Sequence, residues 1–195
     1  MASKEVKTGE GLRRGFKYFN YFMIMMWRLG LGSWINLWPE VGGRIMVICH
    51  RGRKTGKKRL TPVNYTKVGE EIFCTAGFGE TSDWYRNILH NPDVEIWLPD
   101  GWWAGIAKDV TGAEYHTDRM RQVLIGSGIV APLFGIDPRK LTDQQLGAAT
   151  DGYRLIHIQR TEARTGTDGP GDLAWVWPLS VMFLIPYLIF RRRSK

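Results

Sequence analysis

One stretch of the sequence carries a dense cluster of positive charge. The nine residues RGRKTGKKR, from Arg51 to Arg59, hold six cationic side chains and no anionic one. Gly52 and Gly56 interrupt the cluster, and glycine lets backbone N–H groups approach an anion closely. No P-loop is present, because the second glycine is not followed by Lys-Ser or Lys-Thr at the required spacing. The candidate partners are therefore a phosphate-bearing cofactor, a nucleic acid and an anionic membrane.

The positive charge of the chain is local. The formal net charge is +8, and this one stretch supplies +6 of it. A local cluster favours an anion site over a protein that coats nucleic acid. Aromatic residues also do not interleave with the basic ones, as a base-stacking surface requires, so we expect no nucleic-acid partner.

The two cysteines give no sign of a metal site or a disulfide. Cys49 and Cys74 stand alone in apolar, strand-like runs, without the spacing of metal ligands. We predict that both are small core residues and that the chain holds no metal.

The elements that must position the basic loop are typical of a small β-barrel. Apolar stretches bounded by turn residues predict six strands, over 44–50, 59–68, 71–77, 93–98, 102–110 and 153–160. Helices are predicted over 82–91, from Thr111 to about Ile125, and over a shorter segment from Thr142, the last two behind capping-box residues. Mostly antiparallel strands with inserted helices indicate an α+β barrel over residues 41–160.

Apolar segments flank this cofactor-binding domain on both sides. Residues 1–40 include an aromatic- and Met-rich stretch with a basic fringe, which reads as an amphipathic helix in a membrane interface or as a helix packed on the domain's own core. Residues 161–172 are a linker by composition. Residues 173–195 contain eighteen uncharged residues, a helix of ~27 Å at the lower margin for crossing a bilayer. Pro178 and Pro186 would each remove a backbone hydrogen bond from that helix.

We therefore predict that both ends attach the protein to the cytoplasmic side of a membrane in a peripheral or monotopic manner. A spanning C-terminal helix and a soluble protein with a docked tail are the alternatives.

Four blocks of sequence resemble, in order and spacing, the deazaflavin-dependent nitroreductase and quinone reductase family. The blocks are GRKTGKKRLTPV (52–63), TAGFG (75–79), DWYRN (83–87) and NPDVEI (91–96). The C-terminal GPGDLAWVWP (169–178) also resembles an ending found in one branch of that family. The resemblance implies a split β-barrel and a deazaflavin coenzyme, factor 420, whose side chain carries a phosphodiester and a polyglutamate tail. Flavin mononucleotide is the alternative cofactor.

The resemblance also implies a set of site residues. The residues expected at the phosphate or tail, or lining the same groove, are Arg53, Lys54, Thr55, Arg59, Leu60 and Thr61. Those expected along the ring system are Thr75, Ala76, Gly77 and Phe78. Those expected to close the site from the inserted helix are Asp83, Trp84, Tyr85 and Asn87. Tyr85 is also our candidate proton donor by residue type, because a reduced acceptor is an anion until it is protonated. An ordinary barrel tyrosine is the alternative for that residue.

Two functions remain open at this point. The first is an oxidoreductase in which reduced deazaflavin passes a hydride to a lipophilic quinone-like, enone or nitro acceptor at the membrane surface. The second is a membrane-associated fatty-acid- or lipid-binding protein on the same barrel, without redox activity, with Phe78, Trp84 and Trp97 around the acyl tail. The pair Gly77-Phe78 distinguishes the two functions. The planar ring of a deazaflavin needs space and hydrogen-bond donors there, whereas an acyl chain needs apolar contact. The sequence also leaves a homodimer open.

Overall fold

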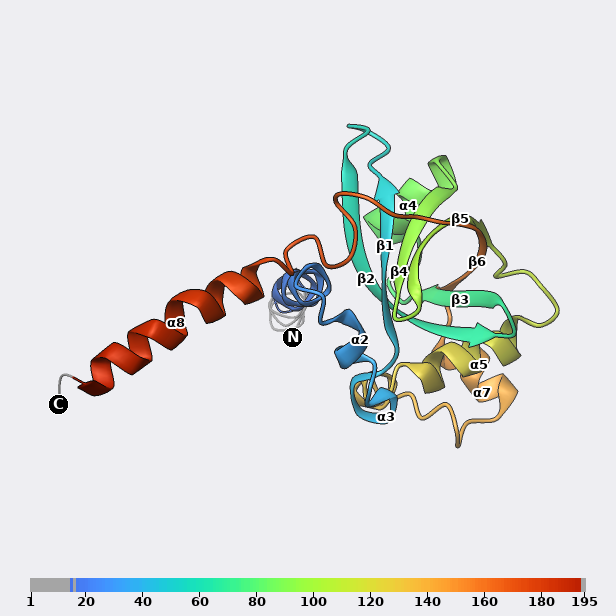
Figure 1. Cartoon of the computed structure of the whole chain (residues 1–195). Helices are drawn as coiled ribbons and strands as arrows, with labels where there is room; N and C mark the ends of the chain where they lie inside the picture. Colours follow the sequence, from blue (N-terminus) through green and yellow to red (C-terminus); the bar gives the residue numbers. More distant parts are fainter. Residues whose placement is uncertain (1–14, 16, 194–195) are drawn as a thin grey trace, which may run out of the picture.

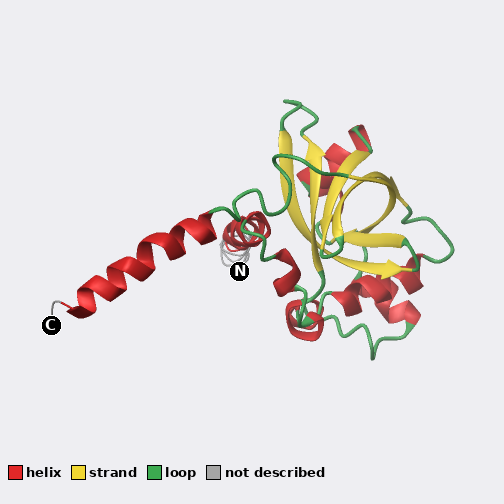
Figure 2. Ribbon diagram, in the orientation of Figure 1, coloured by secondary structure: helices red, strands yellow, loops and turns green. Residues whose placement is uncertain are grey.

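The computed structural model describes residue 15 and residues 17–193, and its centre is a closed six-stranded barrel (Figures 1 and 2). The strands are β1 (Ile45–Arg51), β2 (Lys58–Val68), β3 (Glu71–Ala76), β4 (Asp93–Leu98), β5 (Gly101–Asp109) and β6 (Arg154–Ala163). They close in the order β1-β2-β3-β6-β5-β4, and all neighbouring pairs are antiparallel. The six predicted strands and the α+β class are confirmed. β6 runs on to Ala163, into the stretch predicted as linker.

β1 is buried on both of its faces, which explains why its sequence is a continuous apolar run. Side chains alternate across a strand, so Met46 and Ile48 point into the barrel and belong to its core. Val47 points outward and packs against Trp27 and Trp97. Trp27 comes from the helix over 17–28, so this N-terminal helix packs on the outside of the barrel, at least in part.

Helices cover a second part of the barrel wall. Phe73 of β3 and Leu155 of β6 pack outward against Met120 and Leu146, which come from two of the helices below the barrel. The inserted helices are α4 (Asp83–His90), α5 (His116–Gly126), α6 (Val130–Leu133) and α7 (Asp143–Ala149). Shorter turns precede β1 and α4, namely α2 (Gly32–Ile35), α3 (Pro39–Gly42) and the 3-10 turn Gly79–Thr81.

One of the two predicted capping boxes is confirmed and the other is wrong. At α7 the Thr142 hydroxyl accepts from the Gln145 N–H, and the Gln145 side chain accepts from the Thr142 N–H. Thr111 instead donates its N–H to Asp109 and accepts the N–H of Leu155 through its hydroxyl. These bonds hold Thr111 against the strands, so α5 begins only at His116.

The segment around Arg28 and the segment around Asp172 meet beside the barrel. Arg28, at the end of the N-terminal helix, forms a bidentate ion pair with Asp172, with its closest contact at 2.7 Å. The N–H groups of Gly171 and Leu173 donate to the carbonyls of Trp27 and Arg28. The C-terminal segment is thus fastened to the N-terminal helix before its own helix begins.

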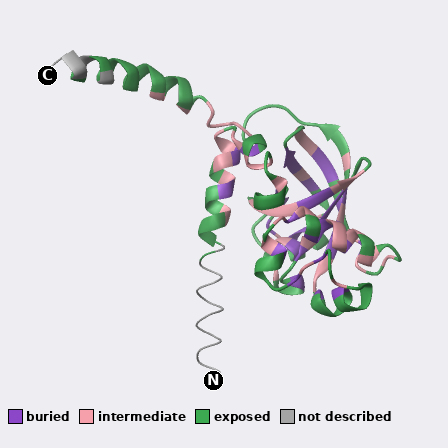
Figure 3. Ribbon diagram, turned by 90° about the horizontal axis from the view of Figure 1, so that it is seen from below, coloured by how far each residue is buried: buried purple, intermediate pink, exposed green. Residues whose placement is uncertain are grey.

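α8 (Val176–Arg193) extends away from the barrel (Figure 1), and its described side chains are exposed along most of its length (Figure 3). Pro186 lies within the helix, and Pro178 lies in its first turn, where proline is tolerated. Within residues 15 and 17–193, we find no helix with both the length and the apolar character needed to cross a membrane.

Both cysteines are buried and free, as predicted.

Candidate functional site

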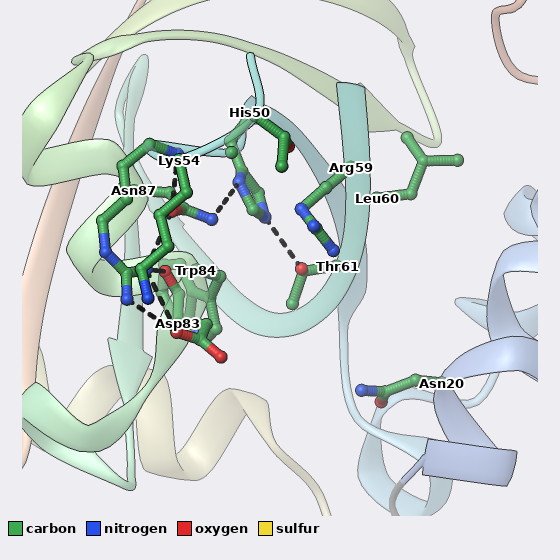
Figure 4. Close-up of a pocket in the computed structure, with 12 residues that line it drawn as sticks. Asn20, His50, Lys54, Arg59, Leu60, Thr61, Asp83, Trp84 and Asn87 are labelled. Carbon is green, nitrogen blue, oxygen red and sulfur yellow. Dashed lines mark hydrogen bonds and ion pairs between the residues drawn. The ribbon is translucent and has the colours of Figure 1, made fainter. Parts of the chain in front are cut away.

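A cavity of about 430 Å³ lies between the β1–β2 loop, the first half of β2, α4 and the N-terminal helix (Figure 4). Nine of its lining residues are among the predicted site residues: Arg53, Lys54, Thr55, Arg59, Leu60, Thr61, Asp83, Trp84 and Asn87. The other three lining residues are Gly52, which belongs to the basic loop, and Asn20 and His50, which were not among the predicted site residues.

The glycines of the basic loop allow its tight turn. The Gly52 N–H donates to the Lys57 carbonyl at 2.9 Å, and the Gly56 N–H donates to the Gly52 carbonyl at 2.7 Å. Gly56 has a φ of +63°, which disfavours any residue with a side chain. A Cβ on Gly52 would lie 2.8 Å from Nε of Arg59, so the missing side chain leaves room for that arginine. These two N–H groups therefore close the turn, and the binding of an anion by other backbone N–H groups of the loop stays a prediction.

Two cations of the loop are used within the protein. Arg53 forms an ion pair of 3.0 Å with Asp83 and also donates to the side chain of Asn87. Lys58 pairs with Glu95 at 3.2 Å, on the outer side of the barrel. The Arg53 guanidinium beside Asp83, together with a smaller effect of a second arginine, lowers the pKa of that carboxyl.

Two other cations face the cavity without a carboxylate partner. Lys54 and Arg59 both line the cavity, and Figure 4 shows Arg59 beside Thr61 and His50. Within the part of the chain that the structure describes, neither side chain forms an ion pair. Arg51 and Lys57 do not line the cavity. The wall therefore carries two positive charges that the protein itself does not neutralise, and such a wall favours an anionic ligand.

A buried histidine connects α4 to the cavity wall. His50 is only 3% exposed. Its Nδ1 lies 3.3 Å from Nδ2 of Asn87, and its Nε2 lies 3.0 Å from Oγ1 of Thr61. Burial, and secondarily the nearby Arg59 cation, lower the pKa of His50 to about 4, so the imidazole is neutral at pH 7.

The ring-facing residues predicted from the resemblance lie outside the cavity lining. Thr75 donates its hydroxyl to the Arg154 carbonyl, and Gly77 lies against the ring of Tyr153. Ala76 is buried in the barrel core, whereas Phe78 is exposed at the surface. Their proposed contact with a coenzyme ring stays a prediction.

Tyr85 also lies outside the cavity lining. Its side chain is buried in the barrel core, and its hydroxyl donates to Asp109 of β5. Burial raises the pKa of Tyr85 to about 12, and the Asp109 carboxylate adds to this rise. Burial opposes ionisation of Asp109, yet the hydrogen bonds from Thr111 and Tyr85 leave the pKa of that carboxyl lowered. The geometry gives Tyr85 a structural bond, and its role as proton donor stays a prediction.

The Tyr85→Phe variant separates these two roles. We expect the free energy of unfolding to fall by roughly 1 to 3 kcal/mol, because a buried hydrogen bond to a carboxylate is lost. Urea denaturation measures this change, and a purely structural role leaves any catalytic activity per folded molecule within about twofold of that of the unchanged protein. A loss of activity of 100-fold or more in folded protein would instead make Tyr85 the proton donor.

Two cavity residues, His50 and Asn20, were not predicted from the sequence, and only one of them could have been. His50 directly precedes the basic loop and pairs with Arg59 across the β1–β2 ladder, so its closeness to the loop was visible in the sequence. Asn20 carried no such signal, because only the packing of the N-terminal helix brings it to the cavity (Figure 4). The described residues contain no group of three or more His, Cys, Asp or Glu side chains arranged to hold a metal.

Comparison with known proteins gives a family match over about half of the chain. Residues 31–127 match the model of the F420H(2)-dependent quinone reductase family. A protein of Mycobacterium tuberculosis that is named as an F420H(2)-dependent quinone reductase is 35% identical over 54 residues. That match covers 26% of this chain and 45% of the relative's own length.

Solved structures resemble the barrel more distantly. A structure named as an F420-H2-dependent reductase has 18% identity and a TM-score of 0.41, and the match covers 60% of this chain and 94% of that one. A conserved hypothetical protein of Mycobacterium tuberculosis has 18% identity and a TM-score of 0.45, covering 69% and 79%. The haem storage protein HutZ of Vibrio cholerae has 12% identity and a TM-score of 0.44, covering 62% and 83%.

Proposed function

Because the chain belongs, through residues 31–127, to the F420H(2)-dependent quinone reductase family, we propose that it is an oxidoreductase that uses the deazaflavin coenzyme. The observation that carries this proposal is the pair of unpaired cations, Lys54 and Arg59, on the wall of one cavity. A coenzyme with a phosphodiester and a chain of carboxylates needs several spaced positive charges.

The side chains of the cavity fit such a coenzyme. Lys54 and Arg59 would hold its anionic part, and Thr55 and Thr61 offer hydroxyl groups on the same wall. Trp84 provides an apolar surface from α4. When bound and reduced, a deazaflavin supplies a hydride. The residues of the chain bind the coenzyme, orient it and exclude water from it. Flavin mononucleotide is the second candidate, because it shares the phosphate.

The acceptor in this proposal is a quinone-like, enone or nitro compound dissolved in a membrane. Exposed apolar side chains on α8 and on the N-terminal helix support a membrane-facing position, which this proposal assigns to the cytoplasmic side. The N-terminal helix also contributes Asn20 to the cavity lining, which would place the cavity close to the lipid surface.

The cavity geometry favours the coenzyme over a bound lipid. The lipid-binding alternative expects Phe78, Trp84 and Trp97 around an acyl tail. Of these three, only Trp84 lines the cavity. Phe78 is exposed at the surface. Trp97 of β4 is buried and packs against Trp27 of the N-terminal helix.

A binding titration tests the proposed function. The full chain, purified in detergent, is titrated with the deazaflavin coenzyme and separately with flavin mononucleotide, and quenching of tryptophan fluorescence is followed. We expect micromolar affinity for the deazaflavin and at least tenfold weaker binding of the flavin, followed by reduction of a quinone when the coenzyme is supplied reduced. Binding of neither compound, with lipid found in the purified protein by mass spectrometry, would replace the oxidoreductase with the lipid-binding protein.

Removal of residues 173–195 tests the membrane attachment. The truncated chain retains Asp172 and its ion pair with Arg28, but it loses the hydrogen bonds that Leu173 and Trp177 donate to the carbonyls of Arg28 and Leu29. We expect most of the protein to move from the membrane fraction to the supernatant, because the exposed apolar surface of α8 is lost. Sedimentation of membranes followed by immunodetection measures the distribution. Full retention in the membrane fraction would identify the N-terminal helix as the main anchor.

A further inference from the structure

A chain of hydrogen bonds runs from Arg53 of the basic loop through Asn87 and His50 to Thr61 on the cavity wall, and the orientation of Asn87 in it is defined. Oδ1 of Asn87 lies 3.1 Å from the backbone nitrogen of Arg53 and 3.0 Å from Nη1 of the same residue. Both groups of Arg53 can only donate, so the amide oxygen of Asn87 must face them. The NH₂ group of Asn87 therefore points to the other side, towards His50.

The orientation of Asn87 favours one tautomer of His50. The NH₂ group of Asn87 can only donate, which favours an unprotonated Nδ1 of His50 that accepts; the backbone of Arg51 also forms a hydrogen bond with the His50 ring. The neutral ring then carries its proton on Nε2, and this N–H faces Oγ1 of Thr61 at 3.0 Å.

The tautomer of His50 in turn determines where the hydroxyl of Thr61 can point. Oγ1 of Thr61 accepts the N–H of His50, so its own proton must point away from the ring. Among the described residues, no hydrogen-bond acceptor for this proton is found, and Thr61 lines the cavity. The direction left for the proton is the cavity itself.

We propose that His50 is a positioning residue that aims the hydroxyl of Thr61 at an anionic oxygen of the bound ligand. The inference rests on the proposed function, because it takes the deazaflavin coenzyme as that ligand. Arg59 lies on the same wall, so an oxygen that reaches Thr61 also lies in the field of a cation. A phosphate oxygen and a carboxylate oxygen share this chemistry, and the coenzyme contains both.

The first test examines the hydrogen-bond chain without any ligand. Long-range ¹H–¹⁵N NMR spectra of the imidazole nitrogens report which of the two carries the proton. We expect His50 to show a protonated Nε2 and an unprotonated Nδ1, and we expect the Thr61→Val variant to shift the Nε2–H resonance. A protonated Nδ1 in the unchanged protein would overturn the proposed orientation of Thr61.

The second test measures binding of the deazaflavin coenzyme by Thr61 variants. Valine keeps the branched shape that suits a strand but lacks the hydroxyl, whereas serine retains a donor. We expect Thr61→Val to bind about 10- to 100-fold more weakly, since a hydrogen bond to a charged group is lost. Thr61→Ser should remain within about threefold of the unchanged chain. Equal unfolding midpoints for all three proteins show that the fold is preserved.

Shortened coenzymes identify the oxygen that Thr61 binds. If the loss caused by Thr61→Val persists with a coenzyme that lacks the glutamate tail, the partner is the phosphate. If the loss disappears with that compound, the partner is a tail carboxylate. A loss that persists with a deazaflavin lacking both groups would overturn the assignment of an anionic oxygen.

The binding experiments distinguish a failure of this inference from a failure of the proposed function. Tight coenzyme binding by the unchanged chain together with unaltered binding by Thr61→Val would refute the role of Thr61 and leave the proposed function standing. No coenzyme binding by the unchanged chain would refute the proposed function and, with it, the ligand assigned to Thr61.

Discussion

A chain with both Lys54→Ala and Arg59→Ala is expected to bind the deazaflavin coenzyme about 30- to 100-fold more weakly than the unchanged protein at low salt. Both cations line the cavity and have no ion pair in the described structure, so each is available to the ligand. Loss of one charged hydrogen bond at an exposed position is worth roughly 1 to 1.4 kcal/mol, or five- to tenfold in affinity.

The effect should depend on ionic strength. Both side chains are exposed, so salt screens their attraction for an anion. Affinity of the unchanged protein should therefore fall as salt is raised, and the affinity of the double variant should respond much less. Isothermal titration calorimetry at two salt concentrations measures both quantities.

The basic loop itself offers a matched control. Arg51→Ala together with Lys57→Ala also removes one arginine and one lysine from the loop, but neither residue lines the cavity. This control should keep coenzyme affinity within about threefold. If the two double variants lose affinity equally, the loop acts through its overall charge and the cavity is not the coenzyme site.

Acid is expected to destabilise the protein partly through His50. Burial of this residue, and secondarily the Arg59 cation, lower its pKa to about 4, against an ordinary value of 6.5. Between these values the unfolded chain binds a proton that the folded protein does not, so stability falls as the pH is lowered. The contribution is fully present above pH 6.5 and is lost as the pH falls towards 4. It amounts to about 2 to 3 kcal/mol between pH 7 and pH 4.5.

The His50→Gln variant tests this contribution. Glutamine does not titrate, so the free energy of unfolding should fall about 2 to 3 kcal/mol less between pH 7 and pH 4.5 than in the unchanged protein. Urea denaturation at the two pH values measures the difference. His90 is exposed at the end of α4 and provides the control, because His90→Gln should leave the pH dependence unchanged. An identical pH dependence in all three proteins would show that the pKa of His50 does not change on folding.

The barrel was accessible to sequence reasoning because strand signals are local. Alternating or continuous apolar runs between turn residues predicted all six strands, with ends that differ by at most a few residues from those observed. The start of α5 was wrong for a non-local reason. Thr111 and Glu114 have the spacing of a capping box, but the hydroxyl of Thr111 accepts a hydrogen bond from Leu155, which is distant in the sequence.

The candidate site was only partly accessible. The sequence located the basic loop and the α4 residues that face it, since a charge cluster and a helix start are visible in a short window. It could not show which of the six cations of the loop form ion pairs within the protein and which line the cavity. Arg53 is bound to Asp83, Lys58 is bound to Glu95, and only Lys54 and Arg59 line the cavity without an ion pair in the described structure.

The sequence by itself therefore determined the strand pattern, the α+β class and the place of the basic loop, because each depends on residues close together in the chain. The tertiary structure alone decided which cations stay unpaired, that Tyr85 donates to Asp109, and that Asn20 reaches the cavity. It also decided that Arg28 joins Asp172, which lies 144 residues away in the sequence. Ion pairs and hydrogen bonds act over a few ångströms in space, so their partners become known only when barrel closure brings distant segments together.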